Sequence, residues 1–195
     1  MENIKKDTII KINRDNVLLF DMDGTLVDTD FANFLSYQEA IQSVIQSAIE
    51  IQYIPDKRFN RTTLNKVIPN LTEENLEKII RQKEKNYKNH LTQTKLNKSV
   101  YDILIKHSKT NKTVLVTNCR KERAILTLEY HKLTDKFSHL FFKKFTDNGK
   151  RVNKYKDAIT SLSLSGQNVI VFENERTEID DALLAGIPIN NIISL

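Results

Sequence analysis

Short apolar runs recur along the chain, and stretches with helical periodicity separate them. Continuous apolar runs that are bounded by polar turn residues are typical of strands buried on both faces. We therefore expect a set of short strands, the last of which is very short. These strands are predicted at residues 17–20, 113–116, 140–142, 169–172 and 192–193.

Between these runs, apolar residues recur every three or four positions, as they do in helices with one buried face. The last such stretch is followed by Gly186 and Pro188, which are residues that end helices. Strands that alternate with helices at this spacing predict a doubly wound α/β fold, with a mostly parallel sheet and helices on both faces. The helices are predicted at residues 99–107, 122–130, 154–162 and 177–185.

Residues 30–97 differ from the rest, because they show no strand pattern and contain no glycine. An apolar stripe at helical spacing covers residues 34–49 and indicates one helix. Thr72 is a typical N-cap for a second helix. We therefore expect an α/β core made of residues 1–29 and 98–195, and a small all-helical cap made of residues 30–97.

Composition narrows the class of protein. The chain has 195 residues, of which 39% are apolar and 28% are charged, as in a globular core domain with a modest insert. No apolar run is long enough to span a bilayer, and the first residues do not resemble a secretory signal. The single cysteine, Cys119, has no partner for an internal disulfide, which favours a cytoplasmic location. The oligomeric state is left open, with a monomer favoured.

The net charge of +5 is unevenly distributed. Residues 132–156 contain eight Lys or Arg and two Asp, whereas residues 157–195 contain six acids and one Arg. A basic segment followed by an acidic one suits an anionic substrate together with a metal cation, although the alternative is ordinary solvated charge. A nucleic-acid partner is disfavoured, because no known binding module and no interleaved aromatic residues are found.

The strongest chemical signal follows the first expected strand, where residues 18–28 read LLFDMDGTLVD. Asp21 and Asp23 lie where open α/β sheets bind ligands, and Gly24 gives the chain the freedom to bring both carboxylates to one site. One carboxylate can attack phosphorus while the other transfers a proton. Two anions would repel a phosphate, so a hard divalent cation such as Mg²⁺ is needed. The alternative is a common Asp-Gly turn.

This segment resembles the first motif, Asp-x-Asp-Gly-Thr, of the haloacid dehalogenase superfamily, a group of aspartate-nucleophile phosphatases and their relatives. The resemblance covers nearly the whole chain, because counterparts of all four family motifs occur in order. It implies that Asp21 is the nucleophile and a metal ligand. It also implies that Asp23 is the general acid/base and binds the metal through its backbone carbonyl. Gly24 and Thr25 are expected to contact the substrate.

The second and third family motifs also have counterparts. Thr117 and Asn118 follow an expected strand, where a hydroxyl and nearby N–H groups can hold a phosphate oxygen; the alternative is that Thr117 caps the next helix. The third motif is a lysine before a helix, and Lys154 matches this position better than Lys150 or Lys156. By resemblance, Lys154 neutralises the phosphate and the nucleophile.

The fourth motif departs from the family pattern, because residues 171–178 read VFENERTE where an acidic cluster is usual. Counting back from Gly186, Asn174 takes the place of the metal-binding aspartate. Its amide oxygen can bind Mg²⁺ but brings no charge, and Glu175 and Glu178 would restore that charge directly or through waters. The alternative is a helix N-terminus whose acids favour the helix dipole.

The predicted helical segment matches the family's first cap type, which covers the active site. Helical spacing puts Asn33 and Tyr37 on one face, and we expect them to face the substrate, although Tyr37 could equally be packing. The resemblance implies a magnesium-dependent phosphatase that hydrolyses a small phosphorylated metabolite, of the sugar phosphate or nucleotide class, through an aspartyl phosphate. The alternatives are a phosphomutase with the same residues and a catalytically weak binding or regulatory domain, which Asn174 motivates.

Overall fold

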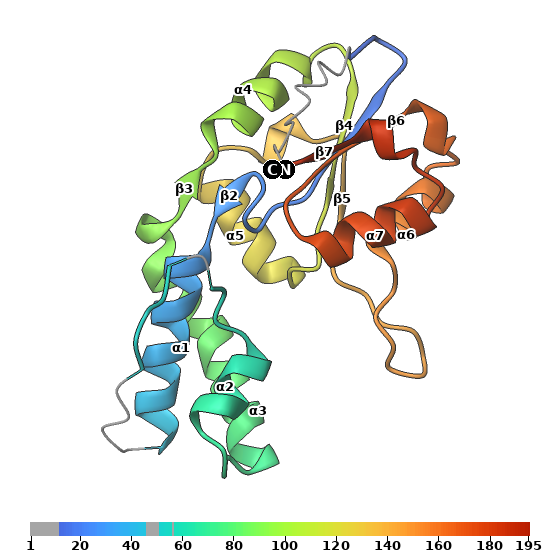
Figure 1. Cartoon of the computed structure of the whole chain (residues 1–195). Coiled ribbons are helices and arrows are strands. Elements are labelled where there is room, and N and C mark those ends of the chain that lie inside the picture. Colours follow the sequence, from blue (N-terminus) through green and yellow to red (C-terminus); the bar gives the residue numbers. More distant parts are fainter. Residues whose placement is uncertain (1–11, 46–50, 56) are drawn as a thin grey trace, which may run out of the picture.

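The computed structural model describes residues 12–45, 51–55 and 57–195. Its central feature is a five-stranded sheet with the order β5-β4-β1-β6-β7, in which every neighbouring pair is parallel (Figure 1). The predicted parallel α/β fold is therefore confirmed. The strands are β1 (Val17–Phe20), β4 (Lys112–Val116), β5 (His139–Phe141), β6 (Val169–Glu173) and β7 (Ile192–Ser194).

Helices cover both faces of this sheet. Leu18 and Phe20 of β1 point into the core cluster on one face, and Leu19 points into the cluster on the other. All three side chains are fully buried, which explains why the strand reads as a continuous apolar run. The first face is covered by α4 (Lys98–His107) and α5 (Lys121–Tyr130), and the second by α6 (Lys154–Ser161) and α7 (Arg176–Leu184).

The described residues between 30 and 93, here called the helical insert, form a separate group of helices below the sheet in Figure 1. Its helices pack around their own apolar cluster, which includes Phe34, Ile41 and Ile79. Thr72 caps α3 as predicted, because its hydroxyl accepts a hydrogen bond from the Asn75 N–H at 3.2 Å. The insert comprises α1 (Asp30–Ile45), α2 (Arg61–Val67), α3 (Glu73–Asn86) and the 3₁₀ helix η1 (Tyr87–Gln93).

Two details of the insert differ from the prediction. Helix α2 was not foreseen, because Leu64 is its one buried residue and seven residues are too few to show a periodic pattern. A strand, β3, lies within residues 30–97, where none was expected. The end of the predicted apolar stripe, Ala48 and Ile49, lies outside the described residues.

A short antiparallel pair of strands connects the insert to the core (Figure 1). In it, β2 (Val27–Asp28) pairs with β3 (Lys95–Leu96). The two places where the chain passes between the core and the insert therefore lie side by side, a few residues from the loop that follows β1.

No helix in the described part of the chain is both long and apolar enough to cross a membrane. Three short 3₁₀ helices complete the core: η2 (Thr134–Lys136), η3 (Gly166–Asn168) and η4 (Ile189–Asn191).

Candidate active site at the carboxyl edge of the sheet

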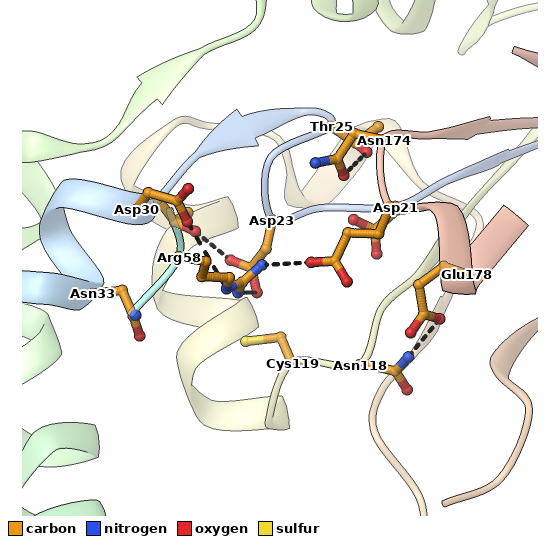
Figure 2. Close-up of polar contacts among 12 residues, drawn as sticks. Asp21, Asp23, Thr25, Asp30, Asn33, Arg58, Asn118, Cys119, Asn174 and Glu178 are labelled. Atoms are coloured by element: carbon orange, nitrogen blue, oxygen red, sulfur yellow. Dashed lines mark hydrogen bonds and ion pairs between the residues drawn. The ribbon is translucent and has the colours of Figure 1, made fainter. Parts of the chain in front are cut away.

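The loop after β1 holds both predicted catalytic carboxylates at the carboxyl end of the sheet (Figure 2). The loop is tight, because the Met22 carbonyl accepts a hydrogen bond from the Val27 N–H at 2.9 Å. Gly24 has a φ of 85°, a backbone conformation that other residues rarely adopt. This turn leaves Asp21 and Asp23 each only 5% exposed. The sequence therefore concentrates two carboxylates in a small, largely buried space.

Asp21 belongs to a buried ion-pair cluster that is centred on Lys154. The lysine Nζ lies 2.7 Å from Asp21 Oδ1, 2.8 Å from Glu173 Oε2 and 3.5 Å from Glu178 Oε2. The side chain of Asn153 caps α6 and so fixes Lys154 at the first position of that helix. Burial raises the pKa of Asp21 to about 7, although Lys154 acts in the opposite direction. The carboxylate of Asp21 is thus short of positive charge even with a lysine in contact.

Asp23 is held by three donors from different parts of the chain. Its Oδ1 accepts a hydrogen bond from the Thr29 hydroxyl at 2.6 Å, and its Oδ2 lies 2.7 Å from Arg123 and 3.0 Å from Arg58. Burial by itself would raise the pKa of Asp23, but the two guanidinium groups outweigh it and hold this pKa well below its usual range. Asp23 is therefore a carboxylate in this arrangement.

Thr117 and Asn118 follow β4 at the same edge of the sheet. The Thr117 hydroxyl accepts a hydrogen bond from the Cys119 N–H at 3.1 Å, while Arg120 is the N-cap residue of α5. Thr117 therefore does not cap that helix. Asn118 Nδ2 donates to Glu178 Oε2 at 2.7 Å, and its Oδ1 is buried with no hydrogen-bond partner in the described part of the chain. This oxygen can accept a hydrogen bond from a bound ligand.

The fourth motif is arranged differently from the expectation. Asn174 Oδ1 accepts a hydrogen bond from the Thr25 hydroxyl at 2.9 Å, so that its amide is turned towards the first loop (Figure 2). Gly24 lies against the same amide, since a Cβ there would come within 2.5 Å of Asn174 Nδ2. Glu173 enters the site instead, and its Oε2 accepts from the Tyr155 hydroxyl at 2.6 Å. Gly24 and Thr25, which we expected to contact the substrate, thus lie against Asn174 and hold its side chain.

A cavity of about 260 Å³ opens between these loops. Neither Thr25 nor Asn174 is among the described residues that line it. The four expected catalytic side chains and the two expected metal-binding glutamates do line it. The cations around it offset much of the negative charge. The carboxylates that line the cavity are Asp21, Asp23, Glu173, Glu175 and Glu178, and the cations are Arg58, Arg123, Lys143, Arg151 and Lys154.

The donors around this cavity were compared with the needs of a metal ion. Within residues 12–45, 51–55 and 57–195, no three His, Cys, Asp or Glu side chains gather closely enough to form a metal centre. Mg²⁺ does not require such a group, because it keeps several waters and binds one or two carboxylates together with a substrate phosphate. The oxygen donors in the cavity and the raised pKa of Asp21 both suit a hard cation. The chemistry of the site therefore fits Mg²⁺.

A second cavity, of about 370 Å³, lies beside the first and is lined by both the helical insert and the core. Asn33 and Tyr37, which we expected to face the substrate, both line it. Each also has a structural contact: Asn33 Nδ2 donates to the Phe59 carbonyl at 2.7 Å, and the ring of Tyr37 lies 5.1 Å from that of Phe59. The two cavities share Arg58, Asn60, Asn118, Arg123 and Lys143.

Cys119 is buried beside the site but is not poised for chemistry. Its Sγ accepts a hydrogen bond from Arg123 Nε at 2.8 Å, and burial raises the pKa of the thiol to about 12. A neutral thiol is a poor nucleophile and a poor metal ligand at neutral pH. Asp21, and not Cys119, is therefore the candidate nucleophile.

Sequence reasoning missed several residues of the site. Glu173 carries the clearest overlooked signal, because an acid that directly ends a buried apolar strand must lie at the edge of the sheet. Arg123 lies within the apolar pattern of α5, and Arg58 lies in a stretch without any pattern. Their role depends on how the insert docks onto the core. Local sequence carries no signal for that docking.

The fold and the site together define an enzyme with paired aspartates, a hydroxyl and a lysine at the carboxyl edge of a parallel sheet. The family model for haloacid dehalogenase-like hydrolases matches residues 18–192, and the chain belongs to this family. The prediction of an enzyme of the haloacid dehalogenase type is therefore confirmed.

Solved structures support the same fold assignment. A predicted phosphoglycolate phosphatase from Haemophilus somnus has a TM-score of 0.73 and 16% identity, with 94% of this chain and 86% of that chain covered. A HAD hydrolase from Entamoeba histolytica has a TM-score of 0.69 and 21% identity, with 88% and 81% covered. CbbY from Rhodobacter sphaeroides, in complex with phosphate, has a TM-score of 0.67 and 13% identity, with 88% and 83% covered. Similarity at these identities shows a shared fold.

Proposed function

We propose that this chain is a magnesium-dependent phosphatase that hydrolyses a small phosphorylated metabolite through an aspartyl phosphate on Asp21. The observation that carries this proposal is the contact of 2.7 Å between Asp21 and Lys154, in a cavity that also holds Asp23 and Thr117. A nucleophile, a cation for the phosphate, a proton carrier and a hydroxyl donor are thereby within reach of one phosphoryl group. The complex of CbbY with phosphate supports phosphate as a ligand of this fold.

In the first step, a carboxylate oxygen of Asp21 attacks phosphorus and the bond from phosphorus to the ester oxygen breaks. Lys154 and the Thr117 hydroxyl hold the phosphoryl oxygens, and the leaving oxygen takes a proton from Asp23. Asp23 is a carboxylate before the substrate binds, so it must first take up a proton from water, and this requires its pKa to rise. A bound anionic substrate would raise it by drawing Arg58 and Arg123 away from that carboxylate.

In the second step, water attacks the aspartyl phosphate. Asp23 takes the proton from this water, the bond between phosphorus and the Asp21 oxygen breaks, and inorganic phosphate leaves. Both side chains then return to their starting protonation states. The helical insert, acting as a cap, would exclude bulk water during the first step and select the substrate.

Mg²⁺ would bind to the carboxylate of Asp21 and the backbone carbonyl of Asp23, with Glu175 and Glu178 nearby directly or through waters. When bound, it neutralises the phosphate and allows a carboxylate to approach it. The part of Asn174 in this site remains a prediction. Glu173 is a further candidate, because it shares Lys154 with Asp21.

The proposal is tested by measuring hydrolysis of p-nitrophenyl phosphate by the wild-type protein and by Asp21→Asn, with and without Mg²⁺. We expect magnesium-dependent turnover that falls at least about 10³-fold in the variant, because a nucleophile is removed without a change of shape. Asp147→Asn, in an exposed turn that does not line the cavity, is the matched control and should keep full activity.

Unchanged turnover in Asp21→Asn would contradict the assignment of the nucleophile. No turnover of any phosphate ester by the wild type would favour a binding or regulatory domain. A phosphomutase, which uses the same residues, would consume a sugar phosphate without releasing inorganic phosphate, and a phosphate-release assay separates it from a phosphatase.

A further inference from the structure

The second cavity has an unusual charge. Its volume of about 370 Å³ suits a small molecule, and it shares five lining residues with the cavity that holds Asp21 and Asp23, here called the reacting cavity. Six of its lining residues are cations and one, Glu84, is an acid. The six cations are Arg58, Arg61, Lys83, Arg120, Arg123 and Lys143.

Two of these six cations have no acidic partner among the described residues, whereas the other four each contact at least one carboxylate. Arg120 and Lys143, at the rim, have no carboxylate within ion-pair distance among the described residues. Burial and the nearby guanidinium groups of Arg120, Arg151 and Arg123 lower the pKa of Lys143. Burial is the larger cause of this lowering, and the three guanidinium groups show that positive charge gathers in the region around Lys143. Because Lys143 lines both cavities, that region extends to the reacting site.

Lys83 carries the argument furthest, because it is buried rather than solvated. Its exposure is 4%, its Nζ lies 3.2 Å from Glu84, and it lies 5.2 Å from the centroid of the Tyr37 ring. A lysine ammonium has three donors, and a single carboxylate does not satisfy them. Burial lowers the pKa of Lys83 to about 8, which reflects a charge that the protein leaves poorly compensated.

A solvated basic surface is the common alternative for a group of cations. It does not account for Lys83 or for Arg123, which is 8% exposed, because neither charge is in bulk water. Lys83 comes from the insert and Arg123 from the core, and both line the same cavity. The arrangement is instead that of a site whose charge is completed by a ligand.

We propose that this cavity is a second anion site, so that the substrate is a small phosphomonoester that carries another anionic group. This proposal rests on the proposed function of the first cavity. The second group is a carboxylate or another phosphate, since both are bound by lysine and arginine through charge-assisted hydrogen bonds. One anion would lie against Asp21 and Lys154, and the other against Lys83, Arg123 and Lys143.

Binding can be tested without catalysis, by isothermal titration of the wild-type protein with Mg²⁺ and three unreactive phosphonates. Methylphosphonate carries a phosphonate alone, phosphonoacetate adds a carboxylate, and methylenediphosphonate adds a second phosphonate. We expect one of the two doubly anionic probes to bind about 10- to 100-fold more tightly than methylphosphonate, as charge-assisted hydrogen bonds allow. Which of them binds better identifies the second group.

Two variants test where the second anion binds. Lys83→Met should remove most of this preference and leave the affinity for methylphosphonate within about twofold. Lys143 lines both cavities, so Lys143→Gln should weaken binding of the doubly anionic probes more than binding of methylphosphonate. Lys121→Gln, an exposed lysine beside Arg120 that does not line the cavity, is the matched control and should change neither affinity. Lys143→Gln keeps the test decisive if the buried substitution impairs folding, because Lys143 is at the rim.

Equal affinity for all three probes, or equal losses for all three in the variants, would overturn the second anion site. These outcomes are distinct from failure of the proposed function, which would appear as absent hydrolysis of p-nitrophenyl phosphate. A preference for two anions that depends on Lys83 would stand even if no hydrolysis were found.

Discussion

Two lysines are buried in the described part of the molecule, and their surroundings are opposite. Lys154, at the edge of the sheet, and Lys83, in the helical insert, are each 4% exposed. Three carboxylates lie within 3.5 Å of Lys154, whereas one carboxylate lies near Lys83. The carboxylates Asp21 and Glu173 outweigh burial and raise the pKa of Lys154, while burial dominates at Lys83 and lowers its pKa to about 8.

The difference shows two uses of a buried charge. At Lys154 the protein supplies the counter-charges itself, so that the lysine is fixed in place before any ligand arrives. At Lys83 the protein supplies too few counter-charges. A bound anion would therefore gain electrostatic free energy by pairing with this lysine. The reacting site is thus organised in advance, and the adjoining cavity is completed by what binds there.

The largest effect should come from Lys154→Met. This change leaves Asp21 and Glu173 buried without their shared cation, and breaking such a buried pair typically costs about 3–5 kcal/mol. We expect the loss of unfolding free energy to be greatest above pH 7 and smaller near pH 5, because Asp21, whose pKa burial already raises to about 7, can then take up a proton. Urea denaturation at both pH values measures this. A loss below about 1 kcal/mol at pH 8 would mean that Lys154 is not the centre of the cluster.

The second effect concerns pH and Mg²⁺. Since the pKa of Asp21 is raised to about 7, this carboxyl must lose a proton before it can bind the ion at lower pH. The affinity for Mg²⁺ should therefore fall about tenfold for each pH unit below 7 and level off above it. Calorimetric titration from pH 5 to 8 measures this, with Asp21→Asn as the reference that removes the dependence. A constant affinity over this range would contradict a role for Asp21 as a ligand.

A smaller effect of opposite sign is expected for Lys83→Met. This variant should raise the unfolding free energy at pH 7 by about 1 kcal/mol, because an apolar chain of similar size replaces a poorly paired buried charge. Lys83 has a lower pKa in the fold than in the unfolded chain, so its protonation costs stability below pH 8 and costs none above about 10.5. The advantage of the variant should therefore shrink as the pH rises through this window.

Paired urea denaturation of the wild type and Lys83→Met at pH 7 and pH 10 checks this sign. The charged groups that act on Lys83 are Glu84, Arg123 and Asp23, and the first of these loses its partner in the variant. A variant that is less stable than the wild type at pH 7 would show that Glu84 compensates Lys83 fully. In that case the two buried lysines would not differ in the way described above.

The smallest effect is expected for Asn174→Asp. The new carboxylate would add charge near the ion but would keep accepting a hydrogen bond from Thr25, which holds it towards the first loop. We expect the affinity for Mg²⁺ to increase about two- to fivefold, as for a charge that acts at a distance in a partly screened site. An increase of 100-fold would indicate that residue 174 turns into the cavity and binds the ion directly. Equal or weaker affinity would contradict any role of position 174 in binding the metal.

Much of the core could be predicted from the sequence, because its signals are local. The apolar run at β1 needs burial on both faces, and the Asp-x-Asp-Gly turn that follows it needs a glycine at φ of 85°. Lys154 was assigned by its place before a helix, and the structure brings it to Asp21. These features depend on neighbours in sequence or on the general geometry of parallel sheets.

The remaining features of the site depend on contacts between distant parts of the chain. Arg58 and Arg123 converge on Asp23 from the insert and from α5, and no local pattern indicates this. The orientation of Asn174 is decided by Thr25, 149 positions away. The charge of Lys83 could not be distinguished from that of solvated lysines until its burial was known.

Arg58 has one further consequence, since it is the insert's charged link to two loops of the core. Its guanidinium lies 3.0 Å from Asp23 and 3.3 Å from Glu175. A tilt of the insert that moved Arg58 away from the core would separate it from both carboxylates. Opening of the insert would therefore release one of the two guanidinium groups from Asp23 and hydrate this carboxylate at the same time, so that domain motion and the charge around Asp23 change together.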